Sequence, residues 1–209
     1  MFLGQKDYPK AESHFLACLE IAEANQYLKE QSIALGNLGS LAYKQGDLDK
    51  AMQFYEKKWL LVDKMDDKAE LIKVLGNIAN IHRDKGQHRE ALEYYEKVLT
   101  IKQTLGNSKD MAITYSVIAD ELRELDRLPE ALIELDKAIV HATENLFILC
   151  EYMHNKAEIL SSMKEFEKSF ETNQNALKLA SEVNKQKIID SIMQLNDKLI
   201  SLMQNRNPE

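Results

Sequence analysis

The sequence predicts an all-α protein in which antiparallel helix pairs stack as a right-handed α-solenoid of about ten helices. Three observations lead to this prediction. Gly and Pro number only 7 and 3 among 209 residues, so few residues interrupt a helix. Apolar residues recur at helical spacing and show no strand-like alternation. The chain also repeats itself every 40 residues, as Gly36 and Gly76 illustrate.

The repeat is visible when two segments are aligned. Residues 35–39, Leu-Gly-Asn-Leu-Gly, match residues 75–79, Leu-Gly-Asn-Ile-Ala, and Gly46-Asp-Leu matches Gly86-Gln-His. The same 40-residue register relates four alanines further along the chain: Ala11, Ala51, Ala91 and Ala131. A period of this length indicates one supersecondary unit per repeat.

Each repeat is predicted to be a pair of helices joined by a tight turn. In one unit, the first helix runs from about Lys68 to Lys85 and the second from about His88 to Leu105. Gly86 ends the first helix, because glycine adopts a left-handed conformation without steric cost. The small Ala91 marks a close crossing of the two helices. Neither helix can bury its apolar stripe alone, so the units must stack.

The register divides the chain into a half repeat at 1–26, repeats at about 27–66, 67–106, 107–145 and 146–185, and a capping helix with a tail at 186–209. The chain is therefore expected to open in the middle of a repeat. The last helix carries apolar residues, among them Met193 and Ile200, on its outer side. Two interpretations stay open: an imperfect cap on a fragment, or a raw solenoid end that packs against a second copy as a homodimer.

Bulk properties exclude several classes of partner. The net charge is −7, which argues against a nucleic-acid binder because phosphate neutralisation needs a basic stripe. No apolar run is long enough to cross a bilayer, and the first residues lack the pattern of a signal peptide. A cytoplasmic protein without membrane partners is predicted. Cys18 and Cys150 are expected to be reduced, buried thiols.

No motif points to catalysis, a metal or a cofactor. The five histidines and two cysteines show neither His-x-x-x-His nor Cys-x-x-Cys spacing, which a helical or knuckle metal site would use. The glycines stand singly, so they form no phosphate-binding loop. We therefore expect no enzyme activity, no metal and no cofactor.

The Gly-x-Leu-x-x-Ala turn at 46–51, the small residue after Leu38 and Tyr55 resemble the tetratricopeptide repeat (TPR). The 40-residue form is similar to the repeats of kinesin light chain, spindle-orientation adaptors and bacterial Rap-type regulators. The resemblance implies a TPR superhelix and a non-catalytic interaction module that binds an extended peptide or a partner helix in its concave groove. The alternative is the peptide-sensing part of a larger bacterial-type regulator, truncated from its effector domain.

Candidate ligand contacts lie on the first helices, which line the concave face of such an array; binding through the convex face stays open. Asn37, Asn77 and Asn155 occupy matching places and can bond a peptide backbone, although Val117 interrupts the row. Basic residues dominate the earlier repeats and acidic residues the later ones, which indicates either a ligand with the opposite charges or a solvated face of mixed charge without preference. The predicted contacts are Asn37, Ser40, Tyr43, Lys44, Lys73, Asn77, Asn80, Arg83, Asp120, Arg123, Glu124, Glu151, His154, Asn155 and Glu158.

Overall fold

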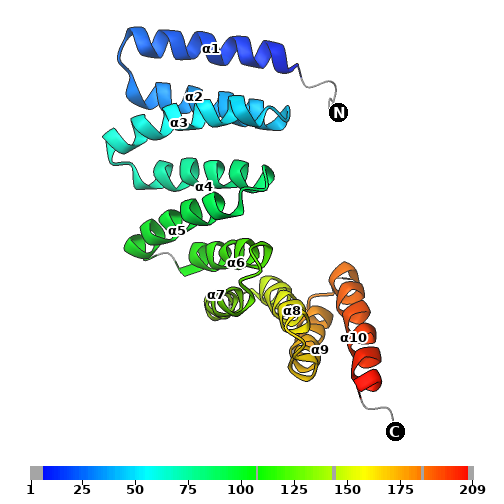
Figure 1. The fold of residues 1–209 in the computed structure, drawn as a ribbon. Helices are drawn as coiled ribbons and strands as arrows, with labels where there is room; N and C mark the ends of the chain where they lie inside the picture. Colours follow the sequence, from blue (N-terminus) through cyan, green and yellow to red (C-terminus); the bar gives the residue numbers. More distant parts are fainter. Residues whose placement is uncertain (1–6, 107, 143–144, 185, 207–209) are drawn as a thin grey trace. The chain divides into compact units, whose positions relative to one another are not determined.

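The computed structural model describes residues 7–106, 108–142, 145–184 and 186–206, which form ten α-helices and no strand (Figure 1). The predicted all-α solenoid class is confirmed. The helices are α1 Tyr8–Ala24, α2 Leu28–Lys44, α3 Leu48–Met65, α4 Lys68–Asp84, α5 His88–Leu105, α6 Ser108–Glu124, α7 Leu128–His141, α8 Leu146–Ser162, α9 Phe166–Glu182 and α10 Gln186–Arg206.

The chain falls into two compact units, residues 1–101 and 102–209, with α5 crossing the boundary. The even-numbered helices α2, α4, α6 and α8 are the first helices of the predicted repeats, and α3, α5, α7 and α9 are the second helices. The predicted boundaries at 107 and 185 and the end of the tail at 207–209 lie outside the described residues.

Local sequence signals set the ends of the helices. The side chains of Asp47 and Asp67 accept hydrogen bonds of 3.0 Å from the backbone amides of Lys50 and Glu70, which caps α3 and α4. Gly86 has a φ of 71°, so it ends the first helix of its pair as predicted. Because these signals are local, the helix ends fall within about two residues of the predicted positions.

In unit 1, the core forms where each second helix packs on its neighbours. Ala51 and Tyr55 of α3 are buried against Val74, Ile78 and Ile81 of α4. A hydrogen bond also joins the two helices of each pair. The Tyr55 hydroxyl lies 2.9 Å from Ser40 Oγ, and forty residues later the Tyr95 hydroxyl donates to Asn80 Oδ1 at 2.6 Å. The sequence repeat thus appears as a repeated contact.

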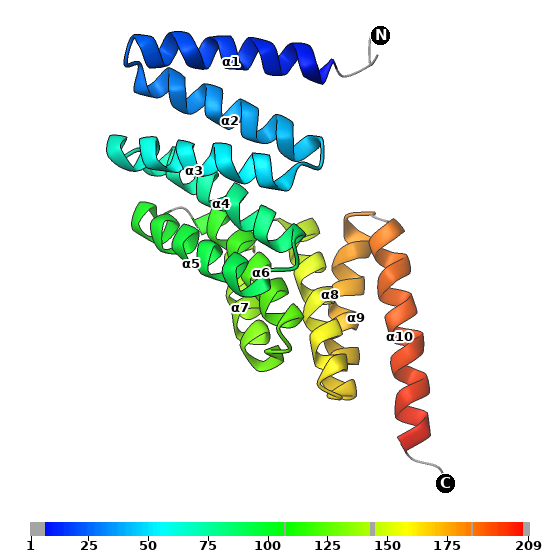
Figure 2. The same ribbon diagram turned by 45° about the horizontal axis from the view of Figure 1, so that its top comes forward.

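In unit 2, α10 packs on α9, as Figures 1 and 2 both show. Its residues Ile192 and Leu199 are fully buried, on the side that the sequence predicts. Met193 and Ile200 on the other side are 52% and 39% exposed, with Asp197 on the same side between them. The apolar outer face of this helix is thus interrupted by a carboxylate.

The two thiols differ in burial. Cys150 is buried in the core of unit 2, as expected, whereas Cys18 is exposed on α1. The prediction that both thiols are buried is therefore wrong for Cys18, because no helix among the described residues of unit 1 covers its side of α1. Among the described residues, no helix combines the length and apolar character needed to cross a membrane.

Candidate functional site

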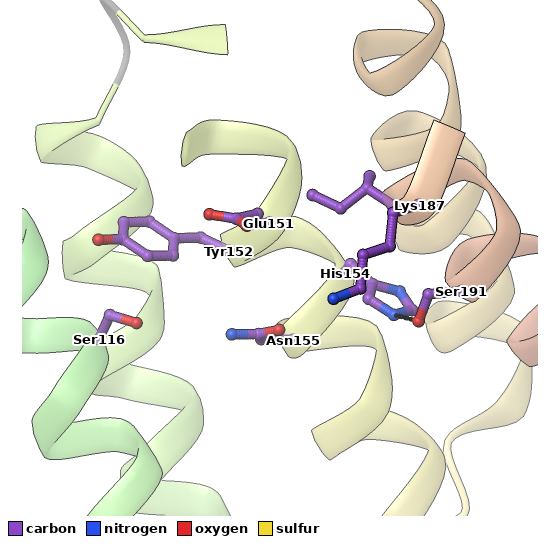
Figure 3. Close-up of a pocket in the computed structure, with 8 residues that line it drawn as sticks. Ser116, Glu151, Tyr152, His154, Asn155, Lys187 and Ser191 are labelled. Atoms are coloured by element: carbon purple, nitrogen blue, oxygen red, sulfur yellow. Dashed lines mark hydrogen bonds between the residues drawn. The ribbon is translucent and has the colours of Figure 1, made fainter. Parts of the chain in front are cut away.

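Three residues predicted as ligand contacts meet in one pocket of unit 2. Glu151, His154 and Asn155 of α8 line a pocket of about 430 Å³. Figure 3 shows Glu151 and Asn155 in the middle of this pocket, the Tyr152 ring directed toward Ser116 of α6, and Lys187 of α10 on the opposite side. The pocket therefore carries both hydrogen-bond donors and acceptors, and charges of both signs.

Partial burial sets the electrostatics of this pocket. Burial raises the pKa of the Glu151 carboxyl, since loss of water disfavours the charged form. Burial likewise raises the pKa of the Tyr152 hydroxyl, and its hydrogen bond with Ser116 acts in the opposite direction. A half-buried carboxylate with too little water around it gains from a cation or a hydrogen-bond donor supplied by a ligand.

His154 is held rigidly at the edge of the pocket. Its Nδ1 lies 2.8 Å from Asn173 Oδ1 and its Nε2 lies 2.9 Å from Ser191 Oγ, a bond drawn in Figure 3. The side chain is buried. Both ring nitrogens thus already have partners within the protein, so His154 shapes the pocket wall and leaves the polar contacts to its neighbours.

Three of the four remaining predicted contacts in unit 2 form an ion-pair cluster. Arg123 lies 3.6 Å from Asp120 on its own helix and 3.5 Å from Glu158 on α8. Glu158 also lies 3.9 Å from His154 Nε2. Glu124 is exposed at the end of α6. The Arg123 guanidinium therefore offsets the negative charges of Asp120 and Glu158, which are two of the four predicted acidic contacts in unit 2.

The predicted contacts in unit 1 divide into internally bonded and exposed groups. Ser40 and Asn80 bond the tyrosines of their own pairs, and Tyr43 of α2 donates to Asp84 of α4. That bond to a carboxylate raises the pKa of the Tyr43 hydroxyl. Of the other five predicted contacts, Asn37, Lys44, Lys73 and Arg83 are exposed and Asn77 is half-buried.

Acidic neighbours also offset the basic residues of unit 1. Lys73 donates to Glu70 at 2.7 Å, and Arg83 lies 3.7 Å from Asp84. Glu70 in turn accepts from the buried Lys58 at 2.6 Å. The charge contrast along the chain is thus weaker than the formal charges indicate.

A second pocket, in unit 1, is mainly apolar. It measures about 370 Å³ and lies between α1 and α2, with Phe15, Cys18 and Ile21 on one side and Tyr27 and Ile33 on the other. Asn37 stands on its rim. This pocket brings one predicted contact together with apolar groups that the prediction did not include.

Two glycines on the predicted binding face have different surroundings. A Cβ atom on Gly36 would lie 2.9 Å from Lys58 Nζ, the end of a flexible side chain that packs over this glycine. A Cβ atom on Gly76 would meet nothing within 4 Å. Val98 stands where the first repeat has Lys58, so a shorter side chain replaces the lysine here. A lysine side chain therefore packs over Gly36, whereas Gly76 has no such neighbour.

Sequence reasoning missed Tyr152, Lys187 and Ser191, which all line the pocket of unit 2. Lys187 and Ser191 belong to α10, which the sequence presented only as a capping helix. Tyr152 falls in a register position that is buried in the other first helices. A signal was available: Lys187 and Ser191 are polar residues spaced one turn apart on a helix predicted to pack on its predecessor.

The described residues contain no group of three or more His, Cys, Asp or Glu side chains that could hold a metal ion. The chemistry that the two pockets offer is hydrogen bonding, charge pairing and apolar contact. These are the interactions by which proteins recognise other polypeptides.

Solved structures with the same fold span nearly the whole chain. BtubC (BKLC) from P. vanneervenii is 14% identical over 98% of this chain and 95% of its own, with a TM-score of 0.68. Repeats of a kinesin-light-chain-like protein from Podosopora anserina are 14% identical over 84% of this chain and 92% of their own, with a TM-score of 0.67. The predicted likeness to kinesin light chain repeats is thus confirmed at the level of the fold.

A third similar structure is a Signal Transduction ATPase with Numerous Domains from Pyrococcus horikoshii, which has a tetratricopeptide repeat sensor. It is 18% identical over 90% of this chain but only 33% of its own, with a TM-score of 0.74. No curated protein shows a significant match to this chain.

The tetratricopeptide repeat model matches residues 1–57 and 70–140, which is more than half of the chain. Repeats of this kind are generally non-catalytic scaffolds for protein–protein interaction. The helix pairs, the repeated tyrosine contacts and this match lead to one conclusion: the chain belongs to the tetratricopeptide repeat family.

Proposed function

We propose that this protein binds an extended peptide, or one helix of a partner protein, on the face that the first helices form within each unit. The observation that carries the proposal is the pocket of unit 2, where Glu151 and Asn155 of a first helix face Lys187. The protein acts in this proposal as a cytoplasmic interaction module, without a cofactor and without catalysis.

The chemistry of this pocket defines the ligand that fits it. Glu151 is half-buried and its pKa is raised by burial, so a lysine or arginine side chain of the ligand relieves its desolvation. The Asn155 amide both donates and accepts, and it can therefore pair with a peptide bond of any sequence. A basic peptide segment with one accessible backbone amide satisfies both residues.

Unit 1 offers a complementary set of contacts. Asn37 and Asn77 hold the same register position on α2 and α4 as Asn155 holds on α8, and both are at least partly exposed. Lys73 and Arg83 add positive charge, although Glu70 and Asp84 offset part of it. We propose that this unit binds an acidic or neutral segment through the two asparagines.

Fluorescence anisotropy with three labelled 12-residue peptides, one lysine-rich, one glutamate-rich and one uncharged, tests the proposal on the full chain. We expect Glu151→Gln to weaken the lysine-rich peptide several-fold, whereas the matched change Glu167→Gln, at an exposed site on α9, has no effect. Asn155→Ala should cost about 1–3 kcal/mol of binding free energy, since it leaves a ligand group unpaired.

The same titrations test unit 1. The double variant Asn37→Ala/Asn77→Ala should weaken all three peptides, and Arg83→Glu should weaken the glutamate-rich peptide most. Equal affinity for the three peptides, unchanged by every substitution, would show that the first-helix face does not bind extended peptides.

A second candidate function is the sensor part of a larger regulator whose repeats read a signalling peptide. It is favoured by the Pyrococcus horikoshii ATPase, in which a chain segment of this fold makes up about a third of the protein and is called a sensor. In this case a short peptide of defined sequence should bind much more tightly than the three general peptides. A phage-displayed peptide library selected on the full chain distinguishes the two functions.

A further inference from the structure

We propose that Trp59 of α3 and Tyr94 of α5 form a binding site for an arginine side chain of a basic partner polypeptide, which replaces the protein's own Lys97 over the two rings. The inference goes beyond the proposed function, because this site belongs to second helices and does not use the first-helix face. Trp59, Tyr94 and Lys97 all lie within unit 1.

Trp59 and Tyr94 form an aromatic pair with a fixed geometry. Their ring centroids are 6.1 Å apart and their planes meet at 82°. Both side chains pack against the core cluster that contains Ala51 and Ile78, and the His82 ring stacks on Tyr94 with centroids 5.3 Å apart. The two rings are only half-buried, so part of the aromatic pair is accessible to solvent.

A cation of the protein itself already occupies the aromatic pair. Lys97 Nζ lies 4.7 Å from the centroid of the Tyr94 ring and 5.8 Å from that of Trp59. Both distances are within about 6 Å, where the negative face of an aromatic ring attracts a cation. Lys97 therefore shows which kind of group the aromatic pair holds. Because Lys97 is exposed and a cation–π contact at an exposed site is weak, a ligand can replace it.

Two carboxylates give the surroundings of the aromatic pair a negative charge. Burial raises the pKa of the Tyr94 hydroxyl, and the charges of Glu56 and Glu93 raise it further, which shows that both glutamates act on this ring. Both glutamate side chains are exposed. A negative potential at this site attracts a cationic ligand, as does the net charge of −7 on the whole chain.

The repeat itself does not require a tryptophan at position 59. Leu99 and Ile139 hold the same register position in the next two second helices, and both are half-buried like Trp59. An aliphatic side chain therefore fills this place in the other repeats. Trp59 is the only tryptophan of the chain, and packing of the helices does not account for its large aromatic face.

A comparison with the next repeat shows how weakly Lys97 is held. Lys137 stands forty residues after Lys97, and its ammonium group donates to Glu134 at 2.7 Å and lies 5.6 Å from the Tyr115 ring centroid. Tyr94 occupies the register position of Glu134. A ring thus stands where the next repeat has the hydrogen-bonded carboxylate, and a ring releases an ammonium group more readily than a carboxylate does.

Arginine is the ligand group that fits these surroundings. A ligand must compete with Lys97, which is tethered beside the site and is therefore present at high effective concentration. A second ammonium group offers nothing that Lys97 lacks. A guanidinium group is planar and weakly hydrated, so it stacks on a ring while its N–H groups donate to a carboxylate such as Glu56 or Glu93. A quaternary ammonium group cannot make that hydrogen bond.

The fluorescence of Trp59 in the full chain reports binding directly. The probes are three uncharged peptides that differ only in their central residue, which is arginine, lysine or the neutral arginine analogue citrulline. We expect a saturable change with the arginine peptide, an affinity at least threefold lower for the lysine peptide and at least fivefold lower for the citrulline peptide. Equal responses to the arginine and citrulline peptides, or no saturable response to the arginine peptide, overturn the proposal. Tetramethylammonium binding more tightly than the arginine peptide would also overturn it.

Substitutions in the protein test the aromatic pair and the displacement of Lys97. Tyr94→Leu should weaken the arginine peptide at least fivefold, whereas Tyr94→Phe keeps the ring and should retain most of that affinity. Lys97→Met removes the competing ammonium group and should strengthen binding at least threefold. The matched change Lys137→Met, at the same register position in unit 2, should have no effect. With all variants folded by circular dichroism, unchanged or weaker binding by Lys97→Met overturns the displacement.

The same titration separates this inference from the proposed function. Glu93→Gln should weaken the arginine peptide at least twofold, whereas Glu96→Gln, at an exposed site on the same helix, should not. Glu151→Gln, which tests the pocket of unit 2, should leave the Trp59 response unchanged. If the Trp59 response is absent while peptides still bind in the anisotropy titrations, this inference fails and the proposed function stands; the reverse result rejects the proposed function alone.

Discussion

Asn173 of α9 accepts a 2.8 Å hydrogen bond from His154 Nδ1 of α8 in the interior of unit 2. The Asn173 amide nitrogen donates to the Ile192 carbonyl and to Asn196 Oδ1 of α10, each at 2.9 Å. Since its nitrogen serves these two acceptors, its oxygen must accept from the imidazole, and Nε2 of the same ring lies 2.9 Å from Ser191 Oγ. One buried amide thus connects three helices and fixes the part of α10 that borders the pocket.

We expect Asn173→Ala to destabilise the protein by at least about 1–3 kcal/mol, because buried partners on both α8 and α10 lose their hydrogen bonds. Urea unfolding followed by circular dichroism measures this change. The matched control is Asn175→Ala on the same helix, where the side chain is exposed, and it should change stability by less than about 0.5 kcal/mol. Equal effects of the two substitutions would contradict a structural role for the Asn173 bonds.

Two mid-helix glycines should respond to alanine in opposite directions. Gly76→Ala should stabilise the protein by about 0.5–1 kcal/mol, since a Cβ atom meets nothing within 4 Å there. Gly39→Ala should destabilise it by about 1–3 kcal/mol, because the new Cβ atom would lie 2.8 Å from the Tyr55 ring, which also bonds Ser40. Thermal unfolding of the two variants measures whether each substitution raises or lowers the stability of the protein. A peptide that binds less well to Gly76→Ala would indicate that its backbone approaches this position.

Features set by neighbours in sequence could be predicted, and features set by distant packing could not. Aspartate caps, Gly86 and the apolar spacing act within a few residues, so the helices and the repeat register follow from them. Cys18 looks like any other residue of an apolar stripe. Its exposure depends on whether another helix packs against α1, which the stripe alone does not show.

The candidate site was only partly predictable for the same reason. Asn155 and Glu151 follow from the register, because their positions on a first helix set the direction of their side chains. His154 shares that helix but is buried, since Asn173 and Ser191 come from two other helices. The offset charges of Arg83 and Asp120 likewise depend on which side chains their rotamers reach.

Glu70 should make the stability of unit 1 depend on pH in the acidic range. Hydrogen bonds from Lys58 and Lys73 lower the pKa of its carboxyl in the folded state. The folded protein therefore binds this proton less readily than the unfolded chain, so the stabilisation is present above the ordinary glutamate pKa of about 4.3 and is lost as the pH falls through the lower folded value. Glu70→Gln should flatten this part of the stability–pH curve, as urea unfolding from pH 2 to 7 would reveal.

The control for Glu70 is Glu130, whose carboxyl pKa is also lowered, by its hydrogen bond from Arg127. Glu130 pairs with Arg127 at the surface, where solvent and salt screen the attraction, so Glu130→Gln should change the curve less. Glu70 pairs with Lys58, a buried ammonium group that would lose its carboxylate. If Glu130→Gln changes the stability–pH curve as much as Glu70→Gln does, burial of Lys58 contributes nothing to the pH dependence of stability.

Glu151 should behave in the opposite way, because burial raises its pKa. The folded protein holds this proton more tightly than the unfolded chain, so stability falls as the pH rises from about 4.3 through the higher folded value. Glu151→Gln should therefore stabilise the protein at pH 7 and leave it unchanged at pH 3, while weakening the lysine-rich peptide. A substitution that raises stability and weakens binding indicates a residue that contributes to ligand binding and destabilises the folded protein. Urea unfolding at the two pH values measures the change in stability, and the anisotropy titration measures the change in peptide binding. If Glu151→Gln loses stability at pH 7, Glu151 is paired within the protein and is not available to a ligand.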